Sequence, residues 1–204
     1  AHHAQVFRLL AQDIAGMQTV ERLADHLSQL ADILVQTSLD LCWKQLKTRH
    51  PQPEQAPKFA VIAYGKLGGK ELAYGSDLDL VFLHDDPTPD ISALYARLGQ
   101  RLSTWMSSQT SAGILFETDL RLRPNGDSGL LAVSVDSFRD YQLDKAWVWE
   151  HQALTRARFC AGDPAVGARF EEIRREILCR QRDLAKLKEE VVAMRQKMYD
   201  AHAS

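Results

Sequence analysis

Residues 73–86 read AYGSDLDLVFLHDD, and this stretch decides how the rest of the sequence is interpreted. Asp77 and Asp79 stand one residue apart, directly before the apolar run LVFL. The run predicts a buried strand, and along an extended strand Asp77 and Asp79 share one face while the leucines between and after them share the other. Two carboxylates at this spacing repel each other, and each costs free energy to desolvate. We therefore expect a cation between them.

Upstream of the acids, the sequence predicts helices and a first strand. Residues 1–50 are helical in pattern, with Gly16 separating a short helix from a longer one that Thr19 caps. The proline-rich stretch HPQPEQAP is a connector, and KFAVIAYG is a short, apolar strand that a glycine closes.

Downstream of the acids, the pattern predicts a small number of strands and then helices. Residues 92–108 form an amphipathic helix with Ser92 as N-cap, residues 113–123 a third strand and residues 130–134 a short fourth one. Further helices are predicted behind Ser134, over residues 145–160, behind the pair Asp163-Pro164, and from about Arg182 onward.

This order of elements predicts an α+β fold, with a small mixed sheet flanked by helices and helical segments at both ends. We expect a helical N-terminal segment at residues 1–50, a catalytic core at 58–134 and a C-terminal helical region at 135–204. Neither end carries a helix start or stop signal, so we expect the chain to be part of a longer one.

The predicted third strand offers a third acid for the cation. In GILFETDLRLR, alternation places Glu117, Asp119, Arg121 and Arg123 on one face. Carboxylates that converge in this way bind Mg²⁺ when phosphates complete its shell, and two ions can share a bridging carboxylate. The alternative is that these residues form the solvated face of an edge strand.

Glycines between the first strand and the acids suggest phosphate binding. The run YGKLGGK contains Gly65, Gly68 and Gly69 beside two lysines, and glycine backbone can approach phosphate oxygens closely. The pattern is not a P-loop, because Glu71 follows Lys70 where Ser or Thr is required, and it is not a dinucleotide fingerprint.

Composition limits the function classes. The 204 residues are 45% hydrophobic and 25% charged, with a net charge of −2, which favours neither nucleic acid nor an anionic membrane as partner. The sequence has no membrane-length apolar run and no secretory signal, and its three cysteines show no metal-ribbon spacing. These features predict a cytoplasmic protein.

The constellation resembles the nucleotidyltransferase superfamily related to DNA polymerase β, which has a glycine followed by an aspartate pair and a later acid on a separate strand. Here Gly65-Lys66 precedes Ser76-Asp77-Leu78-Asp79 at the spacing typical of that superfamily. The sequence departs from the pattern at Lys66, where a small or hydroxyl residue is usual. The departure indicates an ammonium contact to the triphosphate.

A narrower resemblance rests on YGKLGGKELAYGSDLDLVFLHD, GILFETDLRLRPNGDSG and AWVWEHQALTRAR. Together these segments look like the glutamine synthetase adenylyltransferase family, and specifically like its second, adenylylating half. The resemblance implies transfer of AMP from ATP to a tyrosine of glutamine synthetase, in nitrogen regulation, with PII signal protein as a partner of the intact enzyme.

The resemblance also implies roles for particular residues. Asp77, Asp79 and Asp119 would hold Mg²⁺, as two ions, and Asp119 would help deprotonate the tyrosine. ATP would be bound by residues of the glycine-rich turn, the residue before the first acid and the third strand, namely Gly65, Lys66, Gly68, Gly69, Ser76, Arg121 and Arg123. Phosphorolytic removal of AMP and a non-catalytic, nucleotide-binding or regulatory role remain the alternatives.

Overall fold

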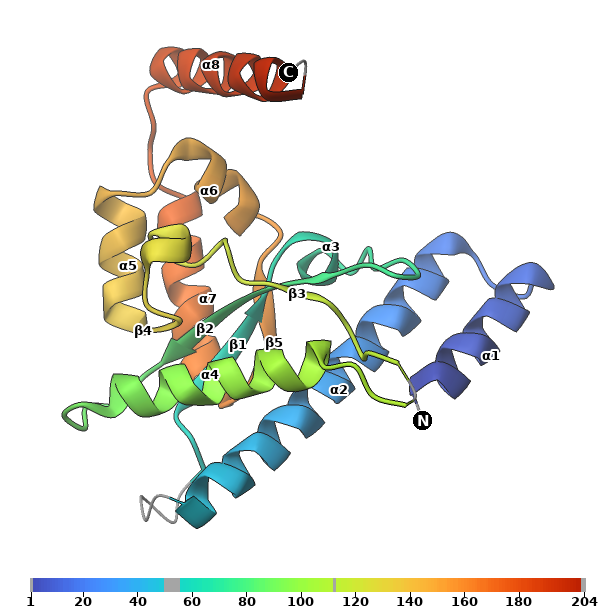
Figure 1. Cartoon of the computed structure of the whole chain (residues 1–204). Coiled ribbons are helices and arrows are strands. Elements are labelled where there is room, and N and C mark those ends of the chain that lie inside the picture. The colour runs from blue at the N-terminus through green and yellow to red at the C-terminus, as the bar shows by residue number, and fades with distance from the viewer. Residues whose placement is uncertain (1, 50–55, 112, 203–204) are drawn as a thin grey trace.

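A five-stranded mixed sheet lies at the centre of the protein (Figure 1), whose computed structural model describes residues 2–49, 56–111 and 113–202. The order of hydrogen-bonded neighbours is β3-β2-β1-β5, and β4 also pairs with β2. The strands are β1 (Phe59–Ala63), β2 (Leu78–His84), β3 (Thr118–Asp119), β4 (Ala132–Ser134) and β5 (Arg158–Gly162).

The direction of the strands places the two ends of β2 in different surroundings. β1 runs antiparallel to both β2 and β5, whereas β3 and β4 run parallel to β2. β3 pairs with the first two residues of β2 and β4 with its last three, Phe82 to His84. The chain between β3 and β4 therefore leaves the sheet beside the aspartates and returns farther along the same edge, at the opposite end of β2.

Helices cover both faces of this sheet. They are α1 (His2–Ile14), α2 (Val20–Arg49), α3 (Gly65–Gly68), α4 (Ile91–Ser107), α5 (Val135–Asp144), α6 (Val148–Leu154), α7 (Pro164–Leu178) and α8 (Leu184–His202), with a 3-10 turn, η1, at Gly126–Ser128. The α+β prediction is confirmed.

Burial on two sides explains why the central strands are apolar throughout. Phe59, Val61 and Phe82 pack in one cluster with α2 and α4. Ile62 and Val81 point the other way and pack with α5, α6 and α7. Every residue of β1 is buried, which is expected of a strand covered by helices on both faces.

Several predicted helix boundaries are confirmed. The Thr19 hydroxyl accepts a bond from the Arg22 amide, and Gly16 lies between α1 and α2 with φ +65°. Ser134 caps α5, and Asp163 caps α7 with Pro164 in its first turn. In the part of the chain that the structure describes, no helix is both long and apolar enough to cross a membrane.

The predicted third strand, residues 113–123, is wrong in extent, because only Thr118 and Asp119 pair with another strand, while Gly113 forms an isolated bridge with Thr110. The amides of Leu115 and Phe116 instead donate to the Met106 carbonyl at the end of α4. After Asp119 the chain turns at once, since the Arg121 amide donates to the Asp119 side chain. Local side-chain bonds here compete with the strand.

The predicted helix over residues 145–160 is also wrong. α6 ends at Leu154, and tight turns bond Arg156 and Ala157 back to the helix. Arg158–Gly162 is then a strand, β5, because the open edge of β1 requires hydrogen-bond partners inside the core.

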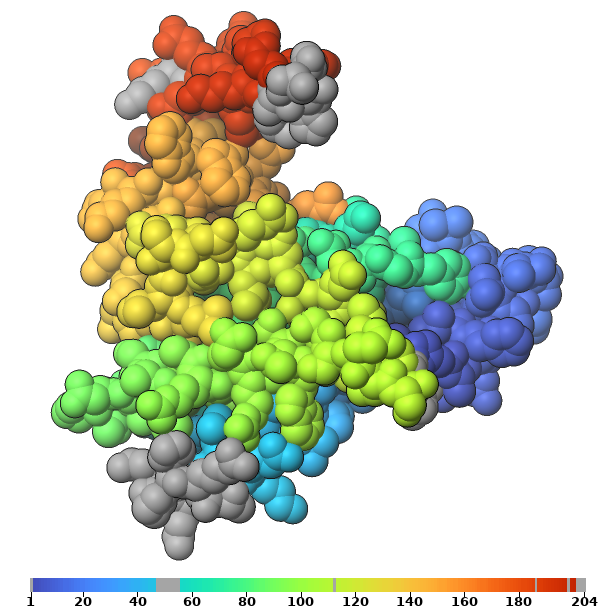
Figure 2. Space-filling model, in the orientation of Figure 1, coloured from blue at the N-terminus to red at the C-terminus, as the bar shows by residue number. Residues whose placement is uncertain are grey.

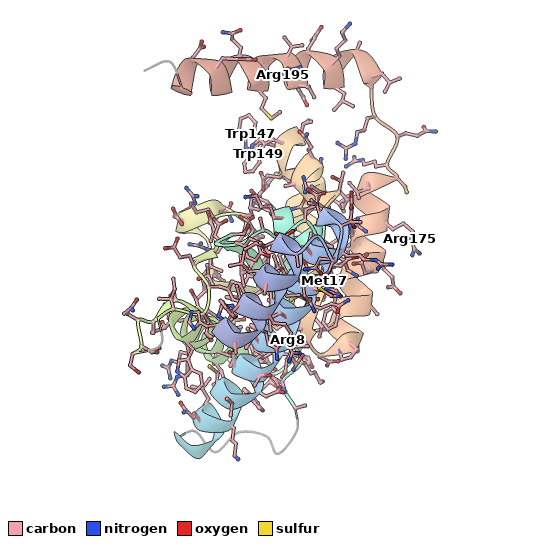
Figure 3. All side chains as sticks on the ribbon, turned by 90° about the vertical axis from the view of Figure 1, so that its right-hand side faces the viewer. Arg8, Met17, Trp147, Trp149, Arg175 and Arg195 are labelled. Atoms are coloured by element: carbon pink, nitrogen blue, oxygen red, sulfur yellow. The ribbon has the colours of Figure 1, made fainter. Side chains whose placement is uncertain are left out.

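The predicted N-cap of α4 is wrong. Ser92 is not the N-cap of α4, because the helix begins at Ile91 behind Asp90, and the Ser92 hydroxyl contacts His84 Nε2 at 3.2 Å. Trp147, directly before α6, and Trp149, within it, are exposed and lie on the side of α6 that faces α8 (Figure 3).

Helix α8 extends beyond the sheet and its covering helices (Figure 2). It contacts α6, and the Lys197 ammonium lies 5.9 Å from the centroid of the Trp147 ring. The aspartates and the glycine-rich turn are therefore positioned by the sheet and by α2, α4 and α7 rather than by α8.

Candidate active site

Three aspartates converge where β2 begins. Asp77 directly precedes β2, Asp79 is its second residue, and Asp119 ends β3. Because β2 and β3 are parallel and in register, Asp79 and Asp119 are direct partners. One carboxylate oxygen from each of the three residues lies within 4.8 Å of the others. The sequence predicted this triad, and the structure brings its members together.

The charge of Asp79 is only partly compensated by nearby cations. Burial raises the pKa of the Asp79 carboxyl, and the nearby carboxylates of Asp77 and Asp119 raise it further. Arg121 and Lys66 act in the opposite direction but do not reverse the shift. In the described residues, neither Asp77 nor Asp79 forms an ion pair. A cation would therefore relieve repulsion at this position.

Asp119 is held differently. Arg121 Nε donates to both of its oxygens, at 3.1 and 2.9 Å, and Arg121 Nη2 donates to the second oxygen as well. These bonds lower the pKa of Asp119, so this carboxyl is ionised at neutral pH. The Arg121 side chain is 74% exposed and is free to rotate away when another cation approaches.

The predicted face of four charged residues is only partly formed. Glu117 is exposed, and its backbone carbonyl accepts a hydrogen bond from the Leu78 amide, where the pairing with β2 starts. Arg123 turns inward, where it donates to the carbonyls of Leu120, at 2.7 Å, and Gly129. The Arg123 guanidinium thus braces the loop after β3.

The glycine-rich turn lies against the acids. α3 begins at Gly65, whose φ of +52° suits glycine, and a β-carbon there would lie 2.0 Å from Asp79 Oδ2. The Tyr64 amide also donates to the Asp79 carbonyl at 2.9 Å. Figure 2 shows this turn and the β3 segment next to each other on one face.

Two further predicted ligands of ATP have distinct surroundings. Lys66 is exposed, and its charge reaches Asp79. Ser76 is buried, and its hydroxyl accepts a bond from the Ala73 amide, which closes the turn before the acids. Ser76 therefore shapes the approach to Asp77.

An open pocket of about 530 Å³ extends from the triad along the loop after β3. Its lining includes Asp77 and Asp119 together with Gln100, Thr118 and Leu131. The glycine-rich turn does not contribute to it. The triad thus lies between the glycine-rich turn with Lys66 on one side and this pocket on the other.

The three carboxylates fit a hard divalent cation. Mg²⁺ prefers oxygen ligands and binds to one or two carboxylates plus phosphate oxygens. The raised pKa of Asp79 and the lack of an ion pair at Asp77 and Asp79, among the described residues, favour a cluster that binds a cation. A mixed sheet that presents this triad beside a glycine-rich turn has the fold of a nucleotidyltransferase-like protein.

Comparison with known proteins narrows this class. Residues 2–173 match the family described as glutamate-ammonia ligase adenylyltransferase. The chain belongs to this family. Three relatives carry the name bifunctional glutamine synthetase adenylyltransferase/adenylyl-removing enzyme: those of Aromatoleum aromaticum, Chromobacterium violaceum and Nitrosomonas europaea.

These relatives are much longer than the chain. They are 67%, 58% and 56% identical to it, and the alignments cover 99%, 98% and 98% of the chain. They cover only 21%, 22% and 21% of the relatives. The chain thus spans about a fifth of the length of the curated relatives it matches.

Proposed function

We propose that the chain carries an adenylyl-transfer site that moves AMP from ATP to a tyrosine of glutamine synthetase. The observation that carries the proposal is the convergence of one carboxylate oxygen each from Asp77, Asp79 and Asp119 within 4.8 Å of one another, with no ion pair at Asp77 or Asp79 among the described residues. The family and the names of its members support the reaction and the protein substrate. PII signal protein is a proposed partner of the longer protein.

Mg²⁺ bound at the three carboxylates would supply charge neutralisation for the phosphates of ATP. Lys66 and the backbone of the glycine-rich turn, Gly65 to Gly69, would hold the triphosphate on their side of the triad. Arg121 would turn from Asp119 to a phosphate oxygen once a metal takes its place.

The reaction forms a bond between the tyrosine oxygen and the α-phosphorus of ATP. The bond from the α-phosphorus to the oxygen that bridges to the β-phosphate breaks, and pyrophosphate leaves. Asp119 lines the open pocket after β3, and its lowered pKa keeps it ionised. It would accept a hydrogen bond from the tyrosine hydroxyl and orient it, while the proton passes to solvent. The work of the protein is alignment and charge neutralisation.

Removal of the metal tests the proposal on this chain. ATP should bind at least ~10-fold more tightly with Mg²⁺ or Mn²⁺ than with EDTA, because the triad repels the triphosphate unless cations lie between them. Isothermal titration calorimetry measures both affinities. Equal affinities would contradict the metal assignment.

The reverse type of reaction is a second candidate, because the relatives are named for both addition and removal of the adenylyl group. In phosphorolytic removal, inorganic phosphate attacks the phosphorus of tyrosyl-AMP, and the products are tyrosine and ADP. Labelled AMP appearing on glutamine synthetase supports transfer, and labelled ADP released from adenylylated glutamine synthetase supports removal. ATP binding with neither product would support a non-catalytic, regulatory role.

A further inference from the structure

Arg158, at the start of β5, lies beneath the glycine-rich turn and points inward. Its Nε and Nη2 donate to the Leu67 carbonyl at 3.3 and 3.1 Å, and its Nη1 donates to the Phe159 carbonyl. The side chain is only 20% exposed. Because these nitrogens already have protein acceptors, Arg158 is not placed as a ligand of phosphate.

Asp32 accepts a bond from the same guanidinium. Its Oδ1 accepts Arg158 Nη2 at 2.9 Å and the Cys160 thiol at 3.1 Å. Asp32 lies in α2, more than a hundred residues away in the sequence, and α2 packs along β5 (Figure 1). One turn later, Gln36 Oε1 accepts the Gly162 amide at 2.8 Å. A single face of α2 therefore fixes β5 from end to end.

The glycine-rich turn needs such support. α3 has four residues, and a helix this short is unstable alone. Both ends of the turn adopt left-handed backbone, at Gly65 with φ +52° and at Lys70 with φ +55°. A β-carbon at Gly68 would lie 2.1 Å from the Arg156 carbonyl, so the turn rests directly on the chain that leads into β5.

The turn is thus fixed on two sides. Asp79 contacts Gly65 and bonds to the Tyr64 amide on one side, and Arg158 bonds to Leu67 on the other. We propose that Arg158 is a positioning residue that holds the glycine-rich turn in its nucleotide-binding shape, and that Asp32 orients Arg158 for this task. The proposal rests on the adenylyl-transfer function proposed above.

Arginine suits position 158, because its three nitrogens spread bonds over the Leu67 carbonyl, the Asp32 carboxylate and the Phe159 carbonyl, which a single ammonium does not reach together. An ammonium at the end of a lysine keeps the charge and loses one of these bonds. Arg158→Lys and Asp32→Asn should therefore each weaken binding of ATP with Mg²⁺ by ~10-fold, the loss of one charge-assisted hydrogen bond.

The Asp32→Asn variant separates positioning from simple charge. Removing a negative charge near the site favours a polyanion such as ATP, so electrostatics alone predicts tighter binding. Positioning predicts weaker binding. The double variant should bind ATP at most ~2-fold more weakly than either single variant, because both changes break the same link between Asp32 and Arg158.

The experiment measures affinity for ATP with Mg²⁺ and for Mn²⁺ alone, together with hydrogen exchange of the Gly68 and Gly69 amides, which bond within the turn. Mn²⁺ affinity should stay within ~2-fold of the wild type, since the triad is intact, whereas amide exchange should accelerate. Arg139→Lys is the matched control, because Arg139 forks onto Glu176 between α5 and α7, away from the turn. It should change neither ATP affinity nor this exchange.

Unchanged or tighter ATP binding by Asp32→Asn, or losses that add in the double variant, would overturn the proposal. If the wild-type chain binds no ATP, the proposed function fails, and hydrogen exchange still decides the positioning role. Unaltered exchange of Gly68 and Gly69 in Arg158→Lys would then overturn it.

Discussion

At the scale of single residues, the three aspartates differ in what holds their charge. Asp119 is paired with Arg121, while burial and its neighbours raise the pKa of Asp79. Alternation along a strand placed Asp77 and Asp79 on one face and offered Glu117 or Asp119 as a third acid, and the family resemblance pointed to Asp119. The sequence did not predict the link between Asp32 and Arg158, because that contact joins elements distant in the sequence. It did not predict the bonds of Arg123 to the Leu120 and Gly129 carbonyls either, because alternation reads residues 113–123 as one continuous strand.

Lys66 provides the first prediction at this scale. Lys66 is exposed on the glycine-rich side of the triad, where an ammonium adds attraction mainly for the β- and γ-phosphates. Lys66→Ala should therefore weaken binding of ATP by ~10-fold and binding of AMP much less. Calorimetry with both nucleotides in Mg²⁺ checks this, and equal losses would give Lys66 a structural role.

Gly65 provides a second prediction with a built-in control. A β-carbon at Gly65 meets Asp79 Oδ2, whereas one at Gly75, whose φ is +69°, meets nothing within 4 Å. Both Gly65→Ala and Gly75→Ala should destabilise the fold by about 1–2 kcal/mol through left-handed backbone strain.

Only Gly65→Ala should also displace Asp79 and so weaken Mn²⁺ binding. Urea unfolding and a Mn²⁺ titration of the two variants measure these effects. Equal Mn²⁺ affinity in both variants would show that the contact between Gly65 and Asp79 does not position the carboxylate.

At the scale of elements, β2 connects the site to a buried polar cluster at its other end. His84 is buried there, stacks on Tyr95 with ring centroids 5.1 Å apart, and contacts Ser92. The sequence predicted β1, β2 and the caps of α5 and α7 from local apolar runs and capping residues. It did not predict β5, whose residues are strand only because the edge of β1 needs a partner.

The pKa of His84 leads to a pH prediction. Burial lowers this pKa, and Asp86 and Asp85 only partly oppose the shift; Asp86 also accepts the Tyr95 hydroxyl, and Asp85 pairs with Arg169. Below the unfolded pKa of about 6.5, the unfolded chain binds a proton that folded His84 resists. Stability should therefore fall as the pH drops below about 6.5 toward the lowered pKa of the folded state.

His84→Gln removes this titration and keeps a polar group beside Ser92. The free energy of unfolding, measured in urea at pH 7.5 and pH 5.5, should fall less for the variant than for the wild type. Equal losses in both proteins would show that His84 does not cause the pH dependence.

At the scale of the whole molecule, helices cover the sheet on both faces and leave the start of β2 open at the surface, where the acids lie. The α+β class followed from the order of apolar runs. The sequence did not predict where the third strand ends or that residues 158–162 leave the predicted helix to form a strand. Alternation and helical periodicity carry no information about which edge of a sheet is free. The chain spans about a fifth of the length of its relatives, so its proposed function is tested best in a family member of their full length that carries this sequence.

The most direct test of the triad is AMP incorporation into glutamine synthetase by a full-length family member that carries this sequence, with a thermal melt of each variant. Asp77→Asn, Asp79→Asn and Asp119→Asn should each abolish transfer, because asparagine keeps the size of aspartate and removes the charge that a hard cation requires. For Asp77→Asn and Asp79→Asn the melting temperature should stay unchanged or rise, because one source of repulsion disappears. Variants that melt early yet still transfer AMP would show that these acids hold the fold, and would contradict the proposed site.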